Sequence, residues 1–175
     1  KTFRDSIAVW FEKRFNVVLN PDEEICALIG SKEGLAHIFR AFLNPGDKIA
    51  IPNPGYPLYA NGGALLNEFH PVILDLDCDS NFVPQINQLQ DADFSGIYLN
   101  YPNNPTGAVV EFSDLKNIVN ICNDKGSIIV YDNAYSEITY NDYKAPSILQ
   151  HEEARQNSIE FHSLSKTFNM TGYRI

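Results

Sequence analysis

Short apolar runs alternate along the chain with longer segments whose apolar residues recur at helical spacing. Apolar runs of four to six residues predict strands, and apolar residues that return every three or four positions predict helices. The predicted strands are residues 24–29, 48–51, 71–76, 96–99, 127–131 and 159–162. The predicted helices are residues 2–15, 31–43, 58–66, 84–89 and 112–123.

The order of these elements predicts the fold class. Strands and helices alternate, which favours a mostly parallel sheet with helices on both faces. Because the strand interiors are apolar without a polar alternation, both faces of the sheet must be covered. The sequence therefore predicts one domain with a three-layer α/β/α fold, and no internal repeat or low-complexity segment interrupts it.

Composition excludes several classes of function. The 175 residues are 44% hydrophobic and 20% charged, which suits one domain with a sizeable core. The net charge of -9 and the absence of a basic run argue against nucleic acid as a partner. No apolar run is long enough to cross a membrane, and no leader opens the chain. We therefore expect a soluble, cytoplasmic protein that binds no membrane.

The cysteine and histidine side chains do not predict a metal site. The three cysteines and four histidines are scattered, without the spacing of a disulfide framework or of paired zinc ligands. Residues 75–79 resemble the start of a calcium loop, but Ser80 and Ile86 stand where that loop requires Gly and Glu. The sequence thus predicts reduced thiols and no bound metal.

Polar segments follow the predicted strands. The five most informative are residues 30–32, 53–56, 103–107, 132–135 and 163–166. The carboxyl ends of parallel strands meet at one edge of a sheet, where ligands bind in open α/β folds, so we expect these segments to share one site. That site would combine a helix N-terminus able to bind an anion with aromatic, amide, carboxylate and amine groups.

These groups suit one kind of ligand. A lysine can form a Schiff base with an aldehyde, a carboxylate can keep a ring nitrogen protonated, and a helix N-terminus can bind a phosphate. Together they describe a site for pyridoxal phosphate. Nicotinamide cofactors and nucleotides fit the same coarse fold, but the chain has neither G-x-G-x-x-G after a strand nor G-x-x-x-x-G-K-[ST].

The motifs of this site occur in a familiar order. They are Asn104-Pro105-Thr106-Gly107, Asp132-x-x-Tyr135 and Ser163-x-Ser165-Lys166, with Arg174 after the lysine. Through them nearly the whole chain resembles the large domain of fold-type I, class I/II aminotransferases, in the aspartate aminotransferase branch. Residues 29–34 and 52–57 most resemble bacterial LL-diaminopimelate aminotransferases and their near relatives. The resemblance implies a PLP-dependent transferase-like fold and pyridoxal 5'-phosphate as the cofactor.

The resemblance also assigns roles to single residues. Lys166 would bind the cofactor covalently and move a proton between substrate and cofactor carbons. Asp132 would pair with the ring nitrogen, although a carboxylate there could instead cap a helix that begins at Asn133. Asn104 and Tyr135 would hydrogen-bond the phenolic oxygen of the cofactor. The alternatives are that Asn104 only shapes a turn and that Tyr135 only packs on a helix face.

Further residues would contact the ring face and the phosphate. Tyr56 would stack on the ring, unless it serves only core packing. The residues assigned to the phosphate are Ser31, Lys32, Ser163, Ser165 and Arg174. Arg174 presents a fork of donors that matches phosphate geometry. Lys32 could instead be a solvated lysine, and Ser165 could only shape its turn.

The resemblance implies a longer enzyme than residues 1–175. Related enzymes add an N-terminal arm and a C-terminal small domain, whose arginine binds the substrate carboxylate. We therefore expect these residues to be a truncated large domain that is inactive alone. The intact enzyme is expected to be a homodimer whose substrates are an amino acid and a 2-oxo acid.

Transamination, of the EC 2.6.1 type, is the leading functional prediction. A PLP-dependent carbon–sulfur β-lyase would share the cofactor residues but would eliminate a side-chain leaving group. A transcription regulator with an aminotransferase-like ligand domain would share the fold, and a DNA-binding domain elsewhere in its chain would distinguish it. The sequence does not name the amino donor.

Overall fold

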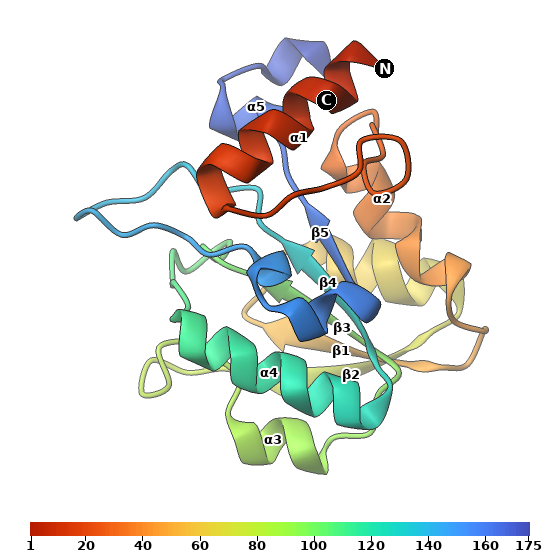
Figure 1. The fold of residues 1–175 in the computed structure, drawn as a ribbon. Coiled ribbons are helices and arrows are strands. Elements are labelled where there is room, and N and C mark those ends of the chain that lie inside the picture. The colour runs from red at the N-terminus through yellow and green to blue at the C-terminus, as the bar shows by residue number, and fades with distance from the viewer.

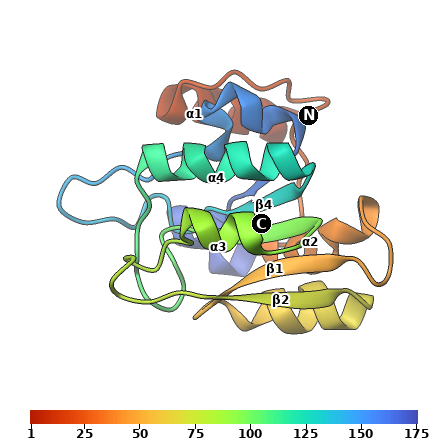
Figure 2. The ribbon, with the colours of Figure 1, turned by 90° about the horizontal axis from the view of Figure 1, so that it is seen from below.

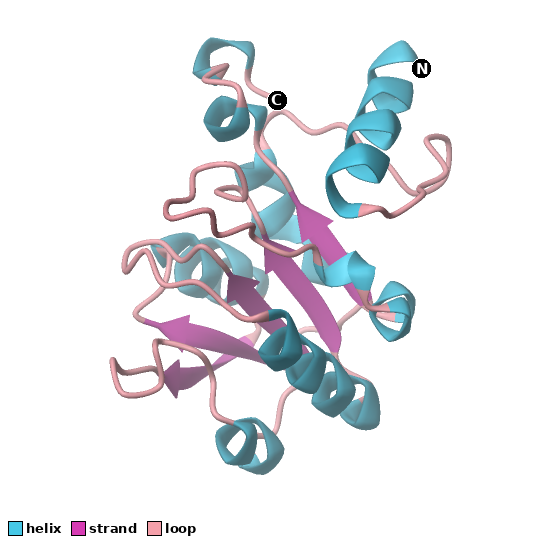
Figure 3. Cartoon of the chain, turned by 60° about the vertical axis from the view of Figure 1, so that its left-hand side comes forward, coloured by secondary structure: helices cyan, strands magenta, loops and turns pink.

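Five strands form one sheet in the order β2-β1-β3-β4-β5, and every neighbouring pair is parallel. The structure, a computed structural model, describes residues 1–175. The strands are β1 Lys48–Asn53, β2 His70–Asp75, β3 Gly96–Asn100, β4 Ile128–Asp132 and β5 Ser158–Phe161. Figure 3 shows the five arrows running in one direction, so the carboxyl ends of all strands lie at one edge.

Helices cover both faces of this sheet. The α-helices are α1 Thr2–Phe15, α2 Ser31–His37, α3 Ile86–Asp91, α4 Phe112–Lys125 and α5 Leu164–Thr167. The other helical turns are η1 Ile38–Ala41, η2 Tyr59–Ala64, η3 Leu65–Asn67, η4 Ile148–Gln150, η5 Glu152–Gln156 and η6 Thr171–Tyr173. Figures 1 and 2 show α3 and α4 together on one face, with α2 and η2 on the other. None of these helices has the length and apolar character that a membrane span requires.

Successive residues of the central strands enter different cores. Ile97 and Leu99 pack beneath α3 and α4, whereas Tyr98 between them packs with α2 and η2. On β4, Ile129 likewise packs in the core beneath α3 and α4, and Val130 packs in the core with α2 and η2. All five side chains are buried, so the interiors of these strands have no solvent-facing position, and polar side chains occur only at their last residues, Asn100 and Asp132. This double burial explains the uninterrupted apolar runs and confirms the predicted three-layer fold.

Helix α1 packs apart from the two main cores. Its Phe11 and Phe15 form a small separate cluster, and Trp10 contacts the His162 ring edge-on at a centroid distance of 5.5 Å. Figure 1 shows α1 and α5 at the same end of the molecule, with both termini. Helix α1 therefore lies beside the carboxyl end of β5, next to the segment that carries Lys166.

The strand predicted at residues 24–29 is wrong. Backbone N–H and C=O groups form a strand only when a neighbouring strand supplies partners, and none of the five strands pairs with this segment. Its apolar side chains Ile25 and Leu28 instead line a cavity that they share with Phe11 of α1. Ile25 and Leu28 are only half-buried and Ile29 is 68% exposed, so this apolar run indicated neither strand pairing nor full burial.

Two predicted helices have a different winding. The helix predicted for residues 31–43 is an α-helix only in α2 and continues as the tighter η1. The helix predicted for residues 58–66 winds as the wide π-helix η2, followed by η3. A Cβ atom at Gly63 of η2 would overlap the Tyr98 hydroxyl, so glycine is needed for the close approach of β3 to this helix.

Candidate functional site

One cavity at the carboxyl edge of the sheet is lined by every side chain that the sequence singled out. Its volume is about 300 Å³, at the lower end of the range of roughly 300–1,000 Å³ that small-molecule sites occupy. The lining residues that were predicted are Ser31, Lys32, Tyr56, Asn104, Asp132, Tyr135, Ser163, Ser165, Lys166 and Arg174. The structure thus brings together α2 and the segments after β1, β3, β4 and β5, while the roles of these residues toward a cofactor stay predictions.

Asp132, the last residue of β4, is a buried carboxylate with only 5% of its surface exposed. Its Oδ2 accepts a hydrogen bond from the Tyr59 hydroxyl at 2.8 Å, and its Oδ1 accepts the Ala134 amide at 3.3 Å. Burial raises the pKa of Asp132 to about 6, and the bond from Tyr59 acts in the opposite direction. The ion pairs of the chain all lie elsewhere. A buried charge without a partner suits a cationic ligand.

Asn100, which ends β3, holds the neighbouring strand end in place. It faces Asp132 in the register of β3 and β4, and its Nδ2 donates to the Asp132 carbonyl oxygen at 2.7 Å. Its Oδ1 accepts the backbone N–H of Asn104, also at 2.7 Å. The Asn104 Nδ2 in turn donates to the Tyr135 hydroxyl at 3.4 Å. One buried amide therefore orients two predicted residues of the site.

Lys166 lies in the short helix α5, just beyond β5. The amides of Lys166 and Thr167 donate to the Ser163 carbonyl at 3.0 and 3.1 Å, which fixes the turn from strand into helix. The exposed Lys166 amine lies 5.9 Å from the centroid of the Tyr135 ring. The amine therefore reaches the side of the cavity that Asn104 and Tyr135 line.

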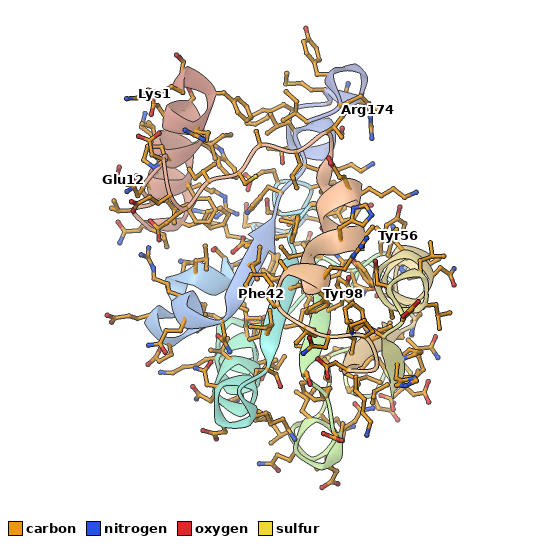
Figure 4. The ribbon with its side chains drawn as sticks, turned by 90° about the vertical axis from the view of Figure 1, so that its right-hand side faces the viewer. Lys1, Glu12, Phe42, Tyr56, Tyr98 and Arg174 are labelled. Carbon is orange, nitrogen blue, oxygen red and sulfur yellow. The ribbon has the colours of Figure 1, made fainter.

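The start of α2 and the end of the chain form a cationic corner of the cavity. Gly30 precedes α2 with a φ of 83°, and a Cβ atom there would come 3.0 Å from Arg174 Nη2. The Glu33 carboxylate accepts the Ile29 amide at 3.1 Å and stabilises the turn into the helix. Figure 4 shows Arg174 at the upper end of α2, with Tyr56 beside the same helix. First-turn amides next to a guanidinium suit a phosphate.

The structure also decides between local alternatives. Asp132 does not cap a helix, and Tyr135 does not pack on one, because residues 134–137 form a turn. Asn104 does lie in a turn, yet its side chain lines the cavity. Tyr56 is half-buried and contacts Tyr59 edge-on at 5.7 Å, so core packing and a place on the cavity are both observed.

Sequence reasoning missed Asn100 and Tyr59. Asn100 is a polar residue that ends an apolar strand, the same signal that identified Asp132, and it could have been found. Tyr59 carries no such signal, because an aromatic three residues after Tyr56 looks like ordinary helix packing. Only the tertiary structure places its hydroxyl on Asp132.

A second cavity, of about 440 Å³, lies between α1 and β5 and shares Gly30 and Ser31 with the first. Its walls are mostly apolar, with Phe3, Ile7 and Ile159 among them. It contains neither Asp132 nor Lys166. The smaller cavity is therefore the one that combines an amine, a carboxylate and a guanidinium.

Comparison with known proteins gives one consistent family. The family model described as "Aminotransferase class I and II" matches residues 1–175. The LL-diaminopimelate aminotransferase of Desulforudis audaxviator (strain MP104C) is 43% identical over 176 residues, which cover 98% of this chain and 44% of that protein. The enzyme of the same name from Aquifex aeolicus (strain VF5) is 45% identical over 99% of this chain and 45% of its own length.

The solved structures agree with these relatives. The aromatic aminotransferase from Pyrococcus horikoshii OT3 superposes with a TM-score of 0.92 at 29% identity, over 98% of this chain and 46% of that chain. The chain thus spans somewhat less than half the length of the proteins it matches.

Proposed function

The chain belongs to the class I and II aminotransferase family, and on this premise we propose that the full-length protein transfers an amino group from an amino acid to a 2-oxo acid with pyridoxal 5'-phosphate. One observation carries the proposal. The buried, unpaired carboxylate of Asp132 opens onto a cavity that also holds the Lys166 amine and the Arg174 guanidinium.

The residues present fit this cofactor by their chemistry. Pyridoxal phosphate offers a ring nitrogen that can carry a positive charge, an aldehyde and a phosphate. The cavity offers the anionic Asp132, the primary amine of Lys166 and the start of α2 with Arg174. The close approach of Arg174 to Gly30, where a side chain would leave no room, supports a compact anion site at this corner.

When bound, the cofactor supplies an electron sink for the bonds at the substrate α-carbon. Lys166 would hold the cofactor through Nζ and then carry the proton between substrate and cofactor carbons. Asp132 would hold a proton on the ring nitrogen. Asn104 Nδ2 and the Tyr135 hydroxyl would donate to the phenolic oxygen, and Tyr56 would cover one face of the ring.

The phosphate would lie at the cationic corner. Backbone amides of Ser31 and Lys32 in the first turn of α2 would donate to it, as would the hydroxyls of Ser163 and Ser165. Arg174 would contribute a fork of charged donors. Because Ser163 also accepts the Lys166 amide, the turn that binds the phosphate would position the amine as well.

We also propose that residues 1–175 form part of a cofactor-binding large domain, and that the intact enzyme is a homodimer in the cytoplasm. The matched relatives are about twice as long as this chain, which supports the proposal that residues 1–175 are only part of the enzyme.

The cysteines Cys26, Cys78 and Cys122 are all unpaired, which suits a reducing compartment such as the cytoplasm. Light scattering of the active full-length protein tests the dimer.

A panel of amino donors with 2-oxoglutarate as acceptor tests the reaction. LL-diaminopimelate is the first donor to try, because the matched relatives carry the name LL-diaminopimelate aminotransferase. We expect formation of glutamate that requires both donor and acceptor. Release of pyruvate and ammonia from cysteine conjugates without any acceptor would instead establish a carbon–sulfur lyase. Absence of turnover with every donor, together with DNA binding, would favour the regulator.

Replacing Arg174 tests the phosphate corner. We expect Arg174→Ala to weaken binding of pyridoxal phosphate by about tenfold or more, because hydrogen bonds to charged groups contribute roughly 1.5–3 kcal/mol. Titration of the cofactor-free full-length protein, followed by absorbance, measures this affinity. Arg40→Ala is the matched control, since Arg40 is exposed and does not line the cavity. Equal affinities in the two variants would remove Arg174 from the site.

A further inference from the structure

Tyr59 is a fully buried tyrosine to which the roles above give no part. It lies in η2, on the opposite side of β3 from α3 and α4, and its side chain belongs to the core shared with α2. Its hydroxyl donates to Asp132 Oδ2 at 2.8 Å. Both groups are buried, so water does not compete with this bond.

The Tyr59 ring is held in place by Tyr98 of β3. The two rings stack with centroids 4.6 Å apart and an interplanar angle of 15°. The Tyr98 hydroxyl is anchored in turn, because it donates to the Leu35 carbonyl of α2 at 2.6 Å. Figure 4 shows Tyr98 beside α2. Since Gly63 leaves room for Tyr98, the stacked pair defines one position for the Tyr59 hydroxyl.

We propose that Tyr59 is a positioning residue for Asp132, which fixes one carboxylate oxygen and favours the charged form that a protonated ring nitrogen requires. The inference rests on the proposed function, because it concerns the same cofactor. A carboxylate has about four lone-pair sites, and Tyr59 and Ala134 occupy two of them. The remaining sites are free for a ligand in the cavity that Asp132 lines.

The surroundings of Asp132 give Tyr59 a distinct part. The titratable groups that act on it or share its cavity are Lys32, Tyr56, Tyr59, Tyr98, Tyr131, Tyr135, His162, Lys166 and Arg174. His162 favours the charged form from beyond β5, but its Nε2 is bound to Glu160 at 2.8 Å. Among these side chains, Tyr59 is the one that donates a hydrogen bond to the carboxylate. Burial disfavours the charged form of Asp132, and the hydrogen bond from Tyr59 is the largest of the interactions that favour it.

Carbon-13 NMR of the aspartate carboxyl groups tests the inference without any cofactor. In cofactor-free full-length protein, with the Asp132 signal assigned by Asp132→Asn, Tyr59→Phe is expected to raise the Asp132 pKa by about one to two pH units. Tyr98→Phe is the matched control. It also removes one buried hydroxyl and keeps the ring stack, but its hydroxyl bonds Leu35 and not Asp132. We expect Tyr98→Phe to leave the Asp132 pKa unchanged.

Cofactor affinity supplies the second readout. Tyr59→Phe is expected to weaken binding of pyridoxal phosphate by about tenfold. In an Asp132→Asn background the same change should have little further effect, because the charge that Tyr59 supports is gone. This non-additivity separates a role through Asp132 from a general loss of packing.

The outcomes are distinguishable. If Tyr59→Phe matches Tyr98→Phe in the Asp132 titration, or if its effect on affinity persists unchanged in the Asp132→Asn background, Tyr59 does not act through Asp132. A wild-type protein that binds no pyridoxal phosphate would overturn the proposed function instead, and the carbon-13 titration would still decide the role of Tyr59. A Tyr59→Phe protein that unfolds would show that the tyrosine serves the fold, against the proposal.

Discussion

Lys166→Ala in the full-length protein is expected to abolish the visible absorbance of lysine-bound cofactor and to lower turnover by at least about 100-fold to 10,000-fold. The covalent link and the proton carrier are one amine, so both are lost together. We expect no other lysine to take its place, because Lys32 is the only other lysine that lines the cavity and it belongs to α2, not to the turn after β5. Absorbance spectra and the donor assay measure the two effects.

A matched control removes a lysine from the other side of the sheet. Lys116 is exposed on α4 and does not line the cavity, so Lys116→Ala should keep both absorbance and turnover. Full activity in Lys166→Ala would contradict the assignment. Loss of turnover in both variants would mean that removal of surface charge, and not the site, controls the rate.

Asp132→Asn should lower turnover by orders of magnitude while it improves the stability of the cofactor-free protein above about pH 6. An amide cannot supply the negative charge that keeps a ring nitrogen protonated, so the chemistry suffers. In cofactor-free protein the same charge is buried without a cation, which disfavours the folded state. Function and stability therefore make opposite demands on this residue.

The pH dependence of stability follows from the direction of the pKa shift. The folded-state pKa of Asp132 is raised to about 6 from its ordinary value of 3.8, with burial as the main cause. Between about pH 4 and pH 6 the unfolded chain binds fewer protons than the folded one, so stability falls as pH rises. The free energy of unfolding of Asp132→Asn, relative to wild type, should therefore increase over this interval and stay level above it.

Urea unfolding of cofactor-free full-length protein at several pH values measures this difference. Asp93→Asn is a control of opposite sign, because the exposed Asp93 carboxyl has its pKa lowered by the hydrogen bond and charge of Lys48. The Asp93 carboxylate therefore makes a small stabilising contribution to the free energy of unfolding above about pH 4, and this contribution is lost at lower pH. A relative stability of Asp132→Asn that does not change between pH 4 and 6 would show that burial does not raise the Asp132 pKa.

The positions of the five strands and of the polar segments after them were predictable from sequence. A strand covered on both faces has an apolar interior, as β3 and β4 have up to their last residues, so the polar residue that ends each run marks the edge of the sheet. Asp132 was found in this way, whereas Asn104 lies four residues beyond Asn100, the polar residue that ends β3. The parallel connections then bring such residues together. The sequence was sufficient to locate these segments, because burial requires apolar residues within each strand and parallel strands bring the residues that follow them to one edge of the sheet.

Pairing, winding and charge state were decided only by the tertiary structure. Residues 24–29 have the composition of a strand, yet no neighbour offers them backbone partners. The π-helical turn at η2 depends on how Gly63 and Tyr98 meet across the layers. The Tyr59 hydroxyl reaches Asp132 across 73 residues of sequence, and the raised Asp132 pKa comes from burial by surrounding elements. Hydrogen bonds and desolvation depend on which atoms are neighbours in space, and the spacing of residues along one chain does not specify those neighbours.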